Sequence, residues 1–166
     1  MSNKLVKVAV ISDTHLMSFR DLPQILISRL KPADIILHAG DLGSVDLLNG
    51  LKTLGPQVYA VCGNMDPPEL RRILPDQQLI TVNQLRIGLF HGRGAPINLI
   101  NTVKERFAND KVDCIVYGHS HCPFNQTQQG VLFFNPGSPT DKFFAPFNSY
   151  GLLEIRNTIK AKIIKL

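Results

Sequence analysis

The stretch VKVAVISDTH, residues 6–15, largely decides the fold, because a run of buried-type residues ends directly in a polar segment. Residues 6–12 are apolar on both faces of an extended chain, which is typical of a buried parallel strand. Residues 35–39 and 58–61 repeat this pattern, and residues 22–30 and 45–54 between them have apolar residues at helical spacing. This alternation of strands and helices predicts a parallel sheet with helices packed on it.

The second half of the chain is predicted to contain mostly short strands. A tight turn at Asn83-Gln84 joins strands over residues 79–82 and 85–90, and a helix follows over residues 97–107. Further strands are predicted over residues 114–117, 124–127, 131–135, 152–156 and 159–164. These strands favour a second, mostly antiparallel sheet. We therefore predict an α/β fold in one domain, residues 1–166: a four-layer α/β/β/α sandwich of two mixed sheets packed face to face, with the helices outside.

Composition narrows the class of protein. The chain has 166 residues, of which 44% are hydrophobic, and its net charge of +5 is not concentrated in one segment. We therefore do not expect nucleic acid as a stable partner, although the surplus charge would attract an anionic substrate. No stretch approaches the roughly 20 apolar residues of a membrane span, and three irregularly spaced cysteines fit a reducing compartment. The expectation is a cytoplasmic protein without a membrane partner.

Five polar segments each follow a predicted strand directly. Because the carboxyl ends of strands in an α/β sheet meet at one edge, where ligands bind, these segments are expected to converge. They are Ser12-Asp13-Thr14-His15, Gly40-Asp41, Gly63-Asn64-Met65-Asp66, His91-Gly92 and Gly118-His119-Ser120-His121.

Each segment alone also has an ordinary explanation. Asp41 could be a helix N-cap, Asn64 a turn residue and His91 a structural histidine, whereas the pair His119 and His121 is the strongest single signal. Together the segments contain four of the five histidines in the chain. Imidazoles mixed with carboxylate and amide oxygens suit manganese, iron, zinc or nickel, and the ligands are numerous enough for two ions.

The order DxH, GD, GN, H, GHxH resembles the signature of the calcineurin-like metallophosphoesterases. The short chain and the GNxD form of the third motif resemble their small prokaryotic phosphodiesterases, and the retromer subunit of the same fold is a further relative. The resemblance implies two metal sites with a shared carboxylate at Asp41. One would comprise Asp13, His15, Asp41 and His121, and the other Asp41, Asn64, His91 and His119.

The resemblance also implies an activity. A hydroxide bridging two divalent ions, foremost Mn²⁺ with Ni²⁺, Fe²⁺ or Zn²⁺ as alternatives, would attack a small phosphodiester in line, and Asn64 would also contact the phosphate. Two alternatives remain open: a phosphomonoesterase of the same fold, and a non-catalytic protein-binding scaffold with a retained metal site, as the retromer relative is generally regarded.

Two positions depart from the wider family. Met65 stands where the larger phosphatases have a histidine that is thought to protonate the leaving group. Asp66 is a weak substitute for that acid and equally fits a turn. Arg93 stands where close relatives often have histidine, and it is expected either to bind a substrate phosphate or to face solvent.

His38, the fifth histidine, fits either a residue that supports the metal ligands or a buried histidine at a strand end.

Residues 143–147 form a loop with three phenylalanines, Phe143, Phe144 and Phe147. One interpretation is that these side chains fold back onto the core. The other is an exposed apolar patch that pairs subunits into a homo-oligomer or forms a wall of the substrate cleft.

Overall fold

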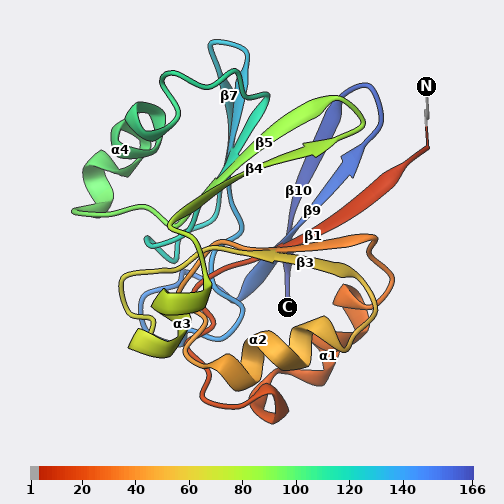
Figure 1. Ribbon diagram of the computed structural model, residues 1–166, viewed down its shortest axis with the longest axis vertical. Coiled ribbons are helices and arrows are strands. Elements are labelled where there is room, and N and C mark those ends of the chain that lie inside the picture. Colours follow the sequence, from red (N-terminus) through yellow and green to blue (C-terminus); the bar gives the residue numbers. More distant parts are fainter. Residues whose placement is uncertain (1–3) are drawn as a thin grey trace.

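Two five-stranded sheets pack face to face in the computed structural model, which describes residues 4–166 (Figure 1). The first sheet has the order β10 (Ile159–Lys165), β9 (Ser149–Ile155), β1 (Val6–Ile11), β2 (Ile35–His38) and β3 (Gln57–Ala60). The second has the order β4 (Gln77–Val82), β5 (Leu85–Phe90), β6 (Cys114–Val116), β8 (Val131–Asn135) and β7 (Phe124–Gln128). The predicted sandwich of two mixed sheets is confirmed.

Helices cover the outer faces of both sheets. Helices α1 (Gln24–Leu30) and α2 (Val45–Lys52) pack on the first sheet, and α4 (Leu99–Arg106) packs on the second. Short 3-10 turns, η1 (Phe19–Asp21) and η2 (Pro96–Asn98), precede α1 and α4. Helix α3 (Pro68–Ile73) was not predicted, because its six residues are too few to show a helical period.

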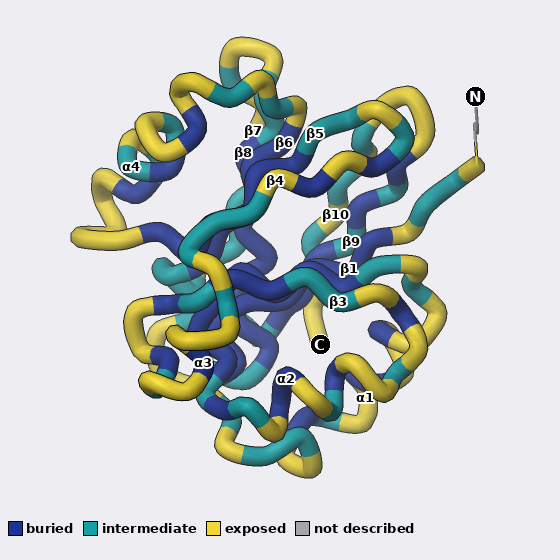
Figure 2. Tube along the Cα trace, in the orientation of Figure 1, coloured by how far each residue is buried: buried dark blue, intermediate teal, exposed yellow. Residues whose placement is uncertain are grey.

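Strand β1 shows why the sandwich has three apolar layers. Val8 and Val10 point into the core between the sheets, whereas Ala9 and Ile11 pack against the layer of α1 and α2. Successive side chains of a strand point to opposite faces, so a strand between two apolar layers must be apolar throughout. Figure 2 shows this burial along the strands, with the exposed residues mainly in the loops and on the outer faces of the helices.

The distribution of strands differs from the prediction in one respect. Strands β9 and β10, expected with the later strands in the second sheet, join the first sheet, where β9 lies antiparallel to β1. The second sheet is consequently not mostly antiparallel: β4–β5 and β7–β8 are antiparallel, but β5–β6 and β6–β8 are parallel. Strand β9 is buried on both faces at most of its positions, which suits its place beside the central strand β1.

Parallel pairing brings the polar segments to one edge. Ile11 pairs with His38 and His38 with Ala60, so β1, β2 and β3 end side by side. In the second sheet β5 and β6 run parallel, with Leu89 opposite Val116, and therefore also end together.

The Asn83-Gln84 turn is confirmed, with φ of 48° and 73° as in the turns that favour tight hairpins. Along residues 4–166, no helix is both long and apolar enough to cross a membrane.

Candidate metal centre

The loops after the five strands bring all seven predicted ligand residues together. Asp41 lies between two of the histidines: its Oδ2 is 3.2 Å from Nε2 of His91 and 3.8 Å from Nε2 of His15. Asp13 Oδ1 is 3.3 Å from Nε2 of His121 and 3.9 Å from that of His91. Asp41 therefore faces histidines that follow strands of both sheets, whereas the two histidines that Asp13 faces both follow strands of the second sheet.

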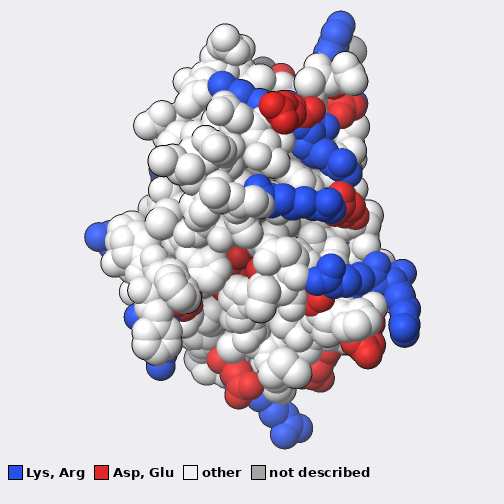
Figure 3. Space-filling model, turned by 90° about the vertical axis from the view of Figure 1, so that its left-hand side faces the viewer, with Lys and Arg blue, Asp and Glu red and all other residues white. Residues whose placement is uncertain are grey.

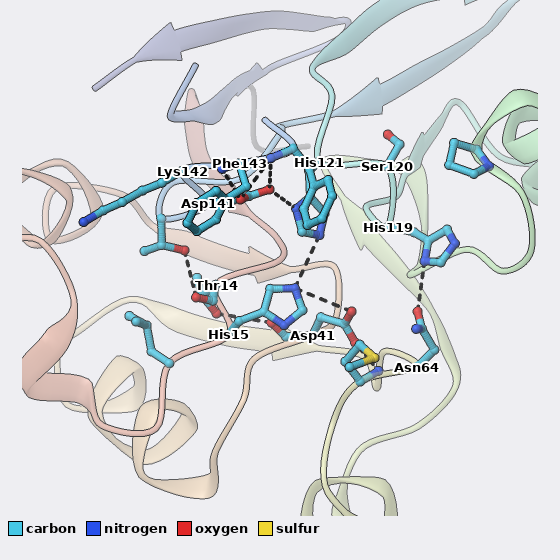
Figure 4. Close-up of a pocket in the computed structure, with 15 residues that line it drawn as sticks. Thr14, His15, Asp41, Asn64, His119, Ser120, His121, Asp141, Lys142 and Phe143 are labelled. Carbon is cyan, nitrogen blue, oxygen red and sulfur yellow. Dashed lines mark hydrogen bonds and ion pairs between the residues drawn. The ribbon is translucent and has the colours of Figure 1, made fainter. Parts of the chain in front are cut away.

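Asn64 joins His119, the remaining histidine, to this group. Its Oδ1 lies 3.0 Å from Nε2 of His91 and 2.9 Å from Nδ1 of His119, so the amide oxygen faces both imidazoles. Figure 4 shows Asn64 and His119 on one side of Asp41, and His15 and His121 on the other. Within residues 4–166, two sets of acidic and histidine side chains present ligand atoms within 4.8 Å of one another: Asp13, His15 and His121, and Asp13, Asp41 and His91.

The backbone at the site is strained. Five of the seven residues adopt the left-handed region, with φ between 49° and 69°: Asp13, His15, Asp41, His119 and His121. Such conformations cost roughly 1 kcal/mol or more each for residues with a side chain, and they cluster where function requires a particular side-chain direction. The surrounding packing holds these side chains toward one another at a cost in stability.

Two glycines allow the loops to approach this closely. A Cβ at Gly63 would lie 2.1 Å from Oδ1 of Asp41, and one at Gly118 would lie 1.9 Å from Oγ of Ser12. Both distances are far below contact distance, so the glycines before Asn64 and His119 are required by packing.

Asp66 fastens two of these loops together. Its Oδ2 accepts hydrogen bonds from the backbone N–H of Asp41 (3.0 Å) and Gly63 (2.8 Å), and its Oδ1 accepts one from Gly43 (3.0 Å). The side chain is buried, and Met65 rather than Asp66 lines the adjacent cavity. These contacts favour the turn role over the role of proton donor.

Arg93 lies at the rim of the site, where its guanidinium pairs with the carboxylate of Asp76. That carboxylate also accepts a hydrogen bond of 2.7 Å from Arg106. The Arg93 side chain is 65% exposed, so the structure favours the alternative in which it faces solvent. Arg93 and Asn64 both line a second hollow next to the site.

Electrostatics at the site follow from the paired carboxylates and imidazoles. A hydrogen bond to Asp13, helped by another to Asp141, raises the pKa of His121 to about 9 despite partial burial. Burial lowers the pKa of His91, but the hydrogen bond to Asp41 and the charges of Asp13 and Asp41 outweigh it, so the net shift is upward. A cation that binds through His121 must therefore displace a proton at neutral pH, which makes its affinity rise with pH up to about 9.

His38 is a buried neutral histidine at the end of β2. Burial is the main cause that lowers its pKa to about 3, and its Nε2 lies 2.9 Å from Oγ1 of Thr14. Thr14 stands between Asp13 and His15, so this contact fixes the loop that presents both of them.

Sequence reasoning missed Asp141. One of its carboxylate oxygens, Oδ2, forms a short hydrogen bond with Nδ1 of His121, which leaves Nε2 of that ring to face Asp13. A carboxylate on the far nitrogen of a metal-binding histidine fixes the tautomer and the orientation of the ring. No local pattern could have suggested this role, because nothing in the sequence places the loop of Asp141 beside His121.

The loop of residues 143–147 does not fold onto the core at its tip. Phe143 is 88% and Phe144 78% exposed, so the core interpretation is wrong for these two residues, whereas Phe147 is half-buried under the ammonium group of Lys165. Phe143 and Phe144 line a cavity of about 620 Å³ that also contains His15, Asp41, Asn64, His119 and His121. The exposed phenylalanines thus form one wall of the candidate site.

The chemistry of the donor set fits two divalent cations. Four imidazoles, two carboxylates and one amide oxygen match borderline metals such as manganese, iron, zinc and nickel, and seven donors exceed the needs of one tetrahedral ion. Asp41 lies between the two groups of histidines, as a shared ligand must.

A two-sheet sandwich with these ligands at its strand ends defines a class of metal-dependent phosphoesterases. The chain belongs to this class: the model of the calcineurin-like phosphoesterase superfamily domain matches residues 6–158. A probable metallophosphoesterase of Methanocaldococcus jannaschii is 34% identical over 165 residues, which cover 96% of this chain and 81% of the relative.

Solved structures show the same fold. A single mutant of Vps29 from Entamoeba histolytica superposes with a TM-score of 0.79 at 25% identity, covering 97% of this chain and 99% of that one. An archaeal phosphodiesterase superposes with a TM-score of 0.76 at 21% identity, covering 97% of this chain and all of the other (100%). The family model confirms the predicted family, and the superpositions confirm the predicted fold.

Proposed function

We propose that this protein is a phosphodiesterase that hydrolyses a small phosphodiester at a centre of two divalent cations, most of all Mn²⁺. The observation that carries the proposal is the position of Asp41, whose Oδ2 lies within 3.8 Å of imidazoles on both sides. Asp13, His15, Asp41 and His121 would hold one cation, and Asp41, Asn64, His91 and His119 the other. When bound, two such cations activate a water molecule and neutralise the charge that develops on the phosphate.

The residues of the chain supply orientation. Because the amide oxygen of Asn64 faces His91 and His119, its NH₂ group is free to donate to a phosphate oxygen. Asp141 holds the ring of His121, and Asp66 holds the backbone of Asp41 and Gly63. These contacts would orient a bound phosphate so that the side open to an attacking water lies opposite the leaving alcohol.

The preference for diesters rests on the missing acid. Met65 is 67% exposed and lines the cavity, and its thioether cannot protonate a leaving group. Asp66 is occupied by three backbone N–H groups. The reaction therefore favours esters whose leaving group departs without help, and a diester, with less charge than a monoester, needs less neutralisation.

A protein-binding scaffold is the second candidate function. Two observations favour it: the fold superposes on Vps29 over 97% of the chain, and Phe143 and Phe144 present exposed apolar surface, which also suits a homo-oligomer. A scaffold without catalysis has no need of seven predicted ligand residues, five of them in left-handed backbone, so catalysis remains the preferred proposal.

The test is a panel of substrates assayed on metal-free protein after addition of Mn²⁺, Ni²⁺, Zn²⁺ or Mg²⁺. We expect hydrolysis of bis(p-nitrophenyl) phosphate that requires added metal, is fastest with Mn²⁺, and is at least about tenfold faster than hydrolysis of p-nitrophenyl phosphate. Faster hydrolysis of the monoester would favour the phosphomonoesterase, and no hydrolysis with any metal would favour the scaffold.

A further inference from the structure

The exposed phenylalanines stand on a loop that is firmly attached to the metal centre. The Asp141 carboxylate accepts hydrogen bonds from the backbone N–H of Phe143 (2.8 Å), Phe144 (3.2 Å) and Ala145 (3.1 Å), while it also bonds His121. The same carboxylate therefore fixes a predicted metal ligand and the backbone that presents both rings.

The base of the loop is fastened at two further points. Ser138 Oγ donates to the backbone oxygen of Asp13 (2.7 Å) and accepts from the N–H of Asp141 (3.0 Å). The side-chain amide of Asn148 donates to the backbone oxygen of Asp141 (2.6 Å). Because the backbone is held in this way, the two phenylalanines project from a defined place, and the loop backbone loses little conformational freedom when a ligand covers them.

The rings stand next to the site where a phosphate would bind. The ring of Phe144 meets that of His121 edge to face, with 6.2 Å between centroids. Across the cavity the lining includes Leu16, Met65 and Pro96, so apolar walls surround a floor of ligand side chains. Figure 4 shows Phe143 beside Asp141 and His121, whereas Lys142 extends away from them.

Apolar walls contribute nothing to the binding of a phosphate group alone. Exposed phenylalanines that ordinary folding would bury are typical of binding sites, and planar rings stack well on aromatic side chains. Lys142 is the one Lys or Arg side chain among the described residues that line the cavity. On the face shown in Figure 3, Lys and Arg are interspersed with Asp and Glu, and wide areas carry neither.

We propose that Phe143 and Phe144 form an aromatic platform that binds a planar aromatic group esterified to the phosphate, such as a nucleobase-bearing alcohol or an aryl alcohol. This inference rests on the proposed function and names the substrate class of that site. The phosphate lies over the metal ligands, and the ring of the ester group stacks on the platform that Asp141 holds in place.

The test measures, by calorimetry, how tightly three phosphate compounds bind to protein supplied with Mn²⁺. The compounds are AMP, phenyl phosphate and ribose 5-phosphate. Stacking of one base changes affinity by about 5- to 150-fold, so AMP should bind at least about fivefold more tightly than ribose 5-phosphate. The variant F143S/F144S should bring the affinities for AMP and ribose 5-phosphate to within about twofold of each other. The comparison with phenyl phosphate distinguishes a nucleobase from a simple aryl group.

The matched control is Ile97→Ser, which removes another exposed apolar side chain (89% exposed) outside the platform and should retain the preference for AMP. Equal affinity of the wild-type protein for all three compounds would overturn the platform while leaving the proposed function intact. The platform would also be wrong if F143S/F144S changed only the mass in solution, because the rings would then pair subunits. Failure to bind any of the three would instead count against the proposed function itself.

Discussion

Replacing Asp41 by asparagine is expected to reduce phosphodiester hydrolysis and metal affinity by more than about 100-fold. Loss of a residue that merely supports a metal ligand typically costs 10- to 100-fold, and Asp41 would contact both cations directly. Asparagine has the same shape but lacks the negative charge between His15 and His91. Metal content by mass spectrometry and hydrolysis of bis(p-nitrophenyl) phosphate would measure the two effects.

The control for this variant is Asp21→Asn, the same chemical change at an exposed position in η1. It should leave both quantities unchanged. Circular dichroism of the metal-free proteins should be the same for both variants, because the backbone N–H of Asp41 still donates to Asp66. Wild-type turnover by Asp41→Asn would show that no shared carboxylate is needed.

Replacing Gly63 by alanine should have the second-largest effect. The new Cβ would lie 2.1 Å from Oδ1 and 2.3 Å from the backbone nitrogen of Asp41, so one of the two loops must move. A shift of about 1 Å at a catalytic group can cost on the order of 100-fold in rate. We expect a loss of that size in hydrolysis, together with weaker metal binding and a lower melting temperature.

Gly55→Ala provides the contrast for this variant. Gly55 has a φ of +111° but open space around its Cβ position, so alanine there adds backbone strain without a clash. It should lower stability by about 1 kcal/mol and leave metal affinity unchanged. If Gly63→Ala also lost only stability, the close approach of Gly63 to Asp41 would have no role in the metal centre.

The sequence was sufficient for the features that depend on local pattern. Continuous apolar character in residues 6–12 and 35–39 predicted central strands, and the polar residues directly after them predicted where the site would lie. Because parallel strands end at one edge, the sequence also predicted that Asp13, Asp41 and Asn64 lie together. His91 and His119 were expected at the same edge because each follows a predicted strand, but the second sheet was predicted to be mostly antiparallel, and it is the parallel pairing of β5 and β6 that brings their ends together.

Features that depend on long-range packing could not be predicted in this way. Nothing local distinguishes a strand that joins the first sheet from one that joins the second, so β9 and β10 were placed wrongly. The contact between Asp141 and His121 spans a loop whose course depends on Ser138 reaching the backbone of Asp13. The left-handed backbone of five of the predicted ligand residues is likewise not a preference of their residue types.

The measurement that tests the central claim most directly is a titration of metal-free protein with Mn²⁺, followed by hydrolysis of bis(p-nitrophenyl) phosphate. The protein concentration should lie well above the dissociation constant, so that the end point reports stoichiometry. We predict that activity rises until two ions are bound per chain, as a centre with two groups of ligands around Asp41 requires. Full activity with one ion per chain, or no activity at any Mn²⁺ concentration, would contradict a two-metal phosphodiesterase.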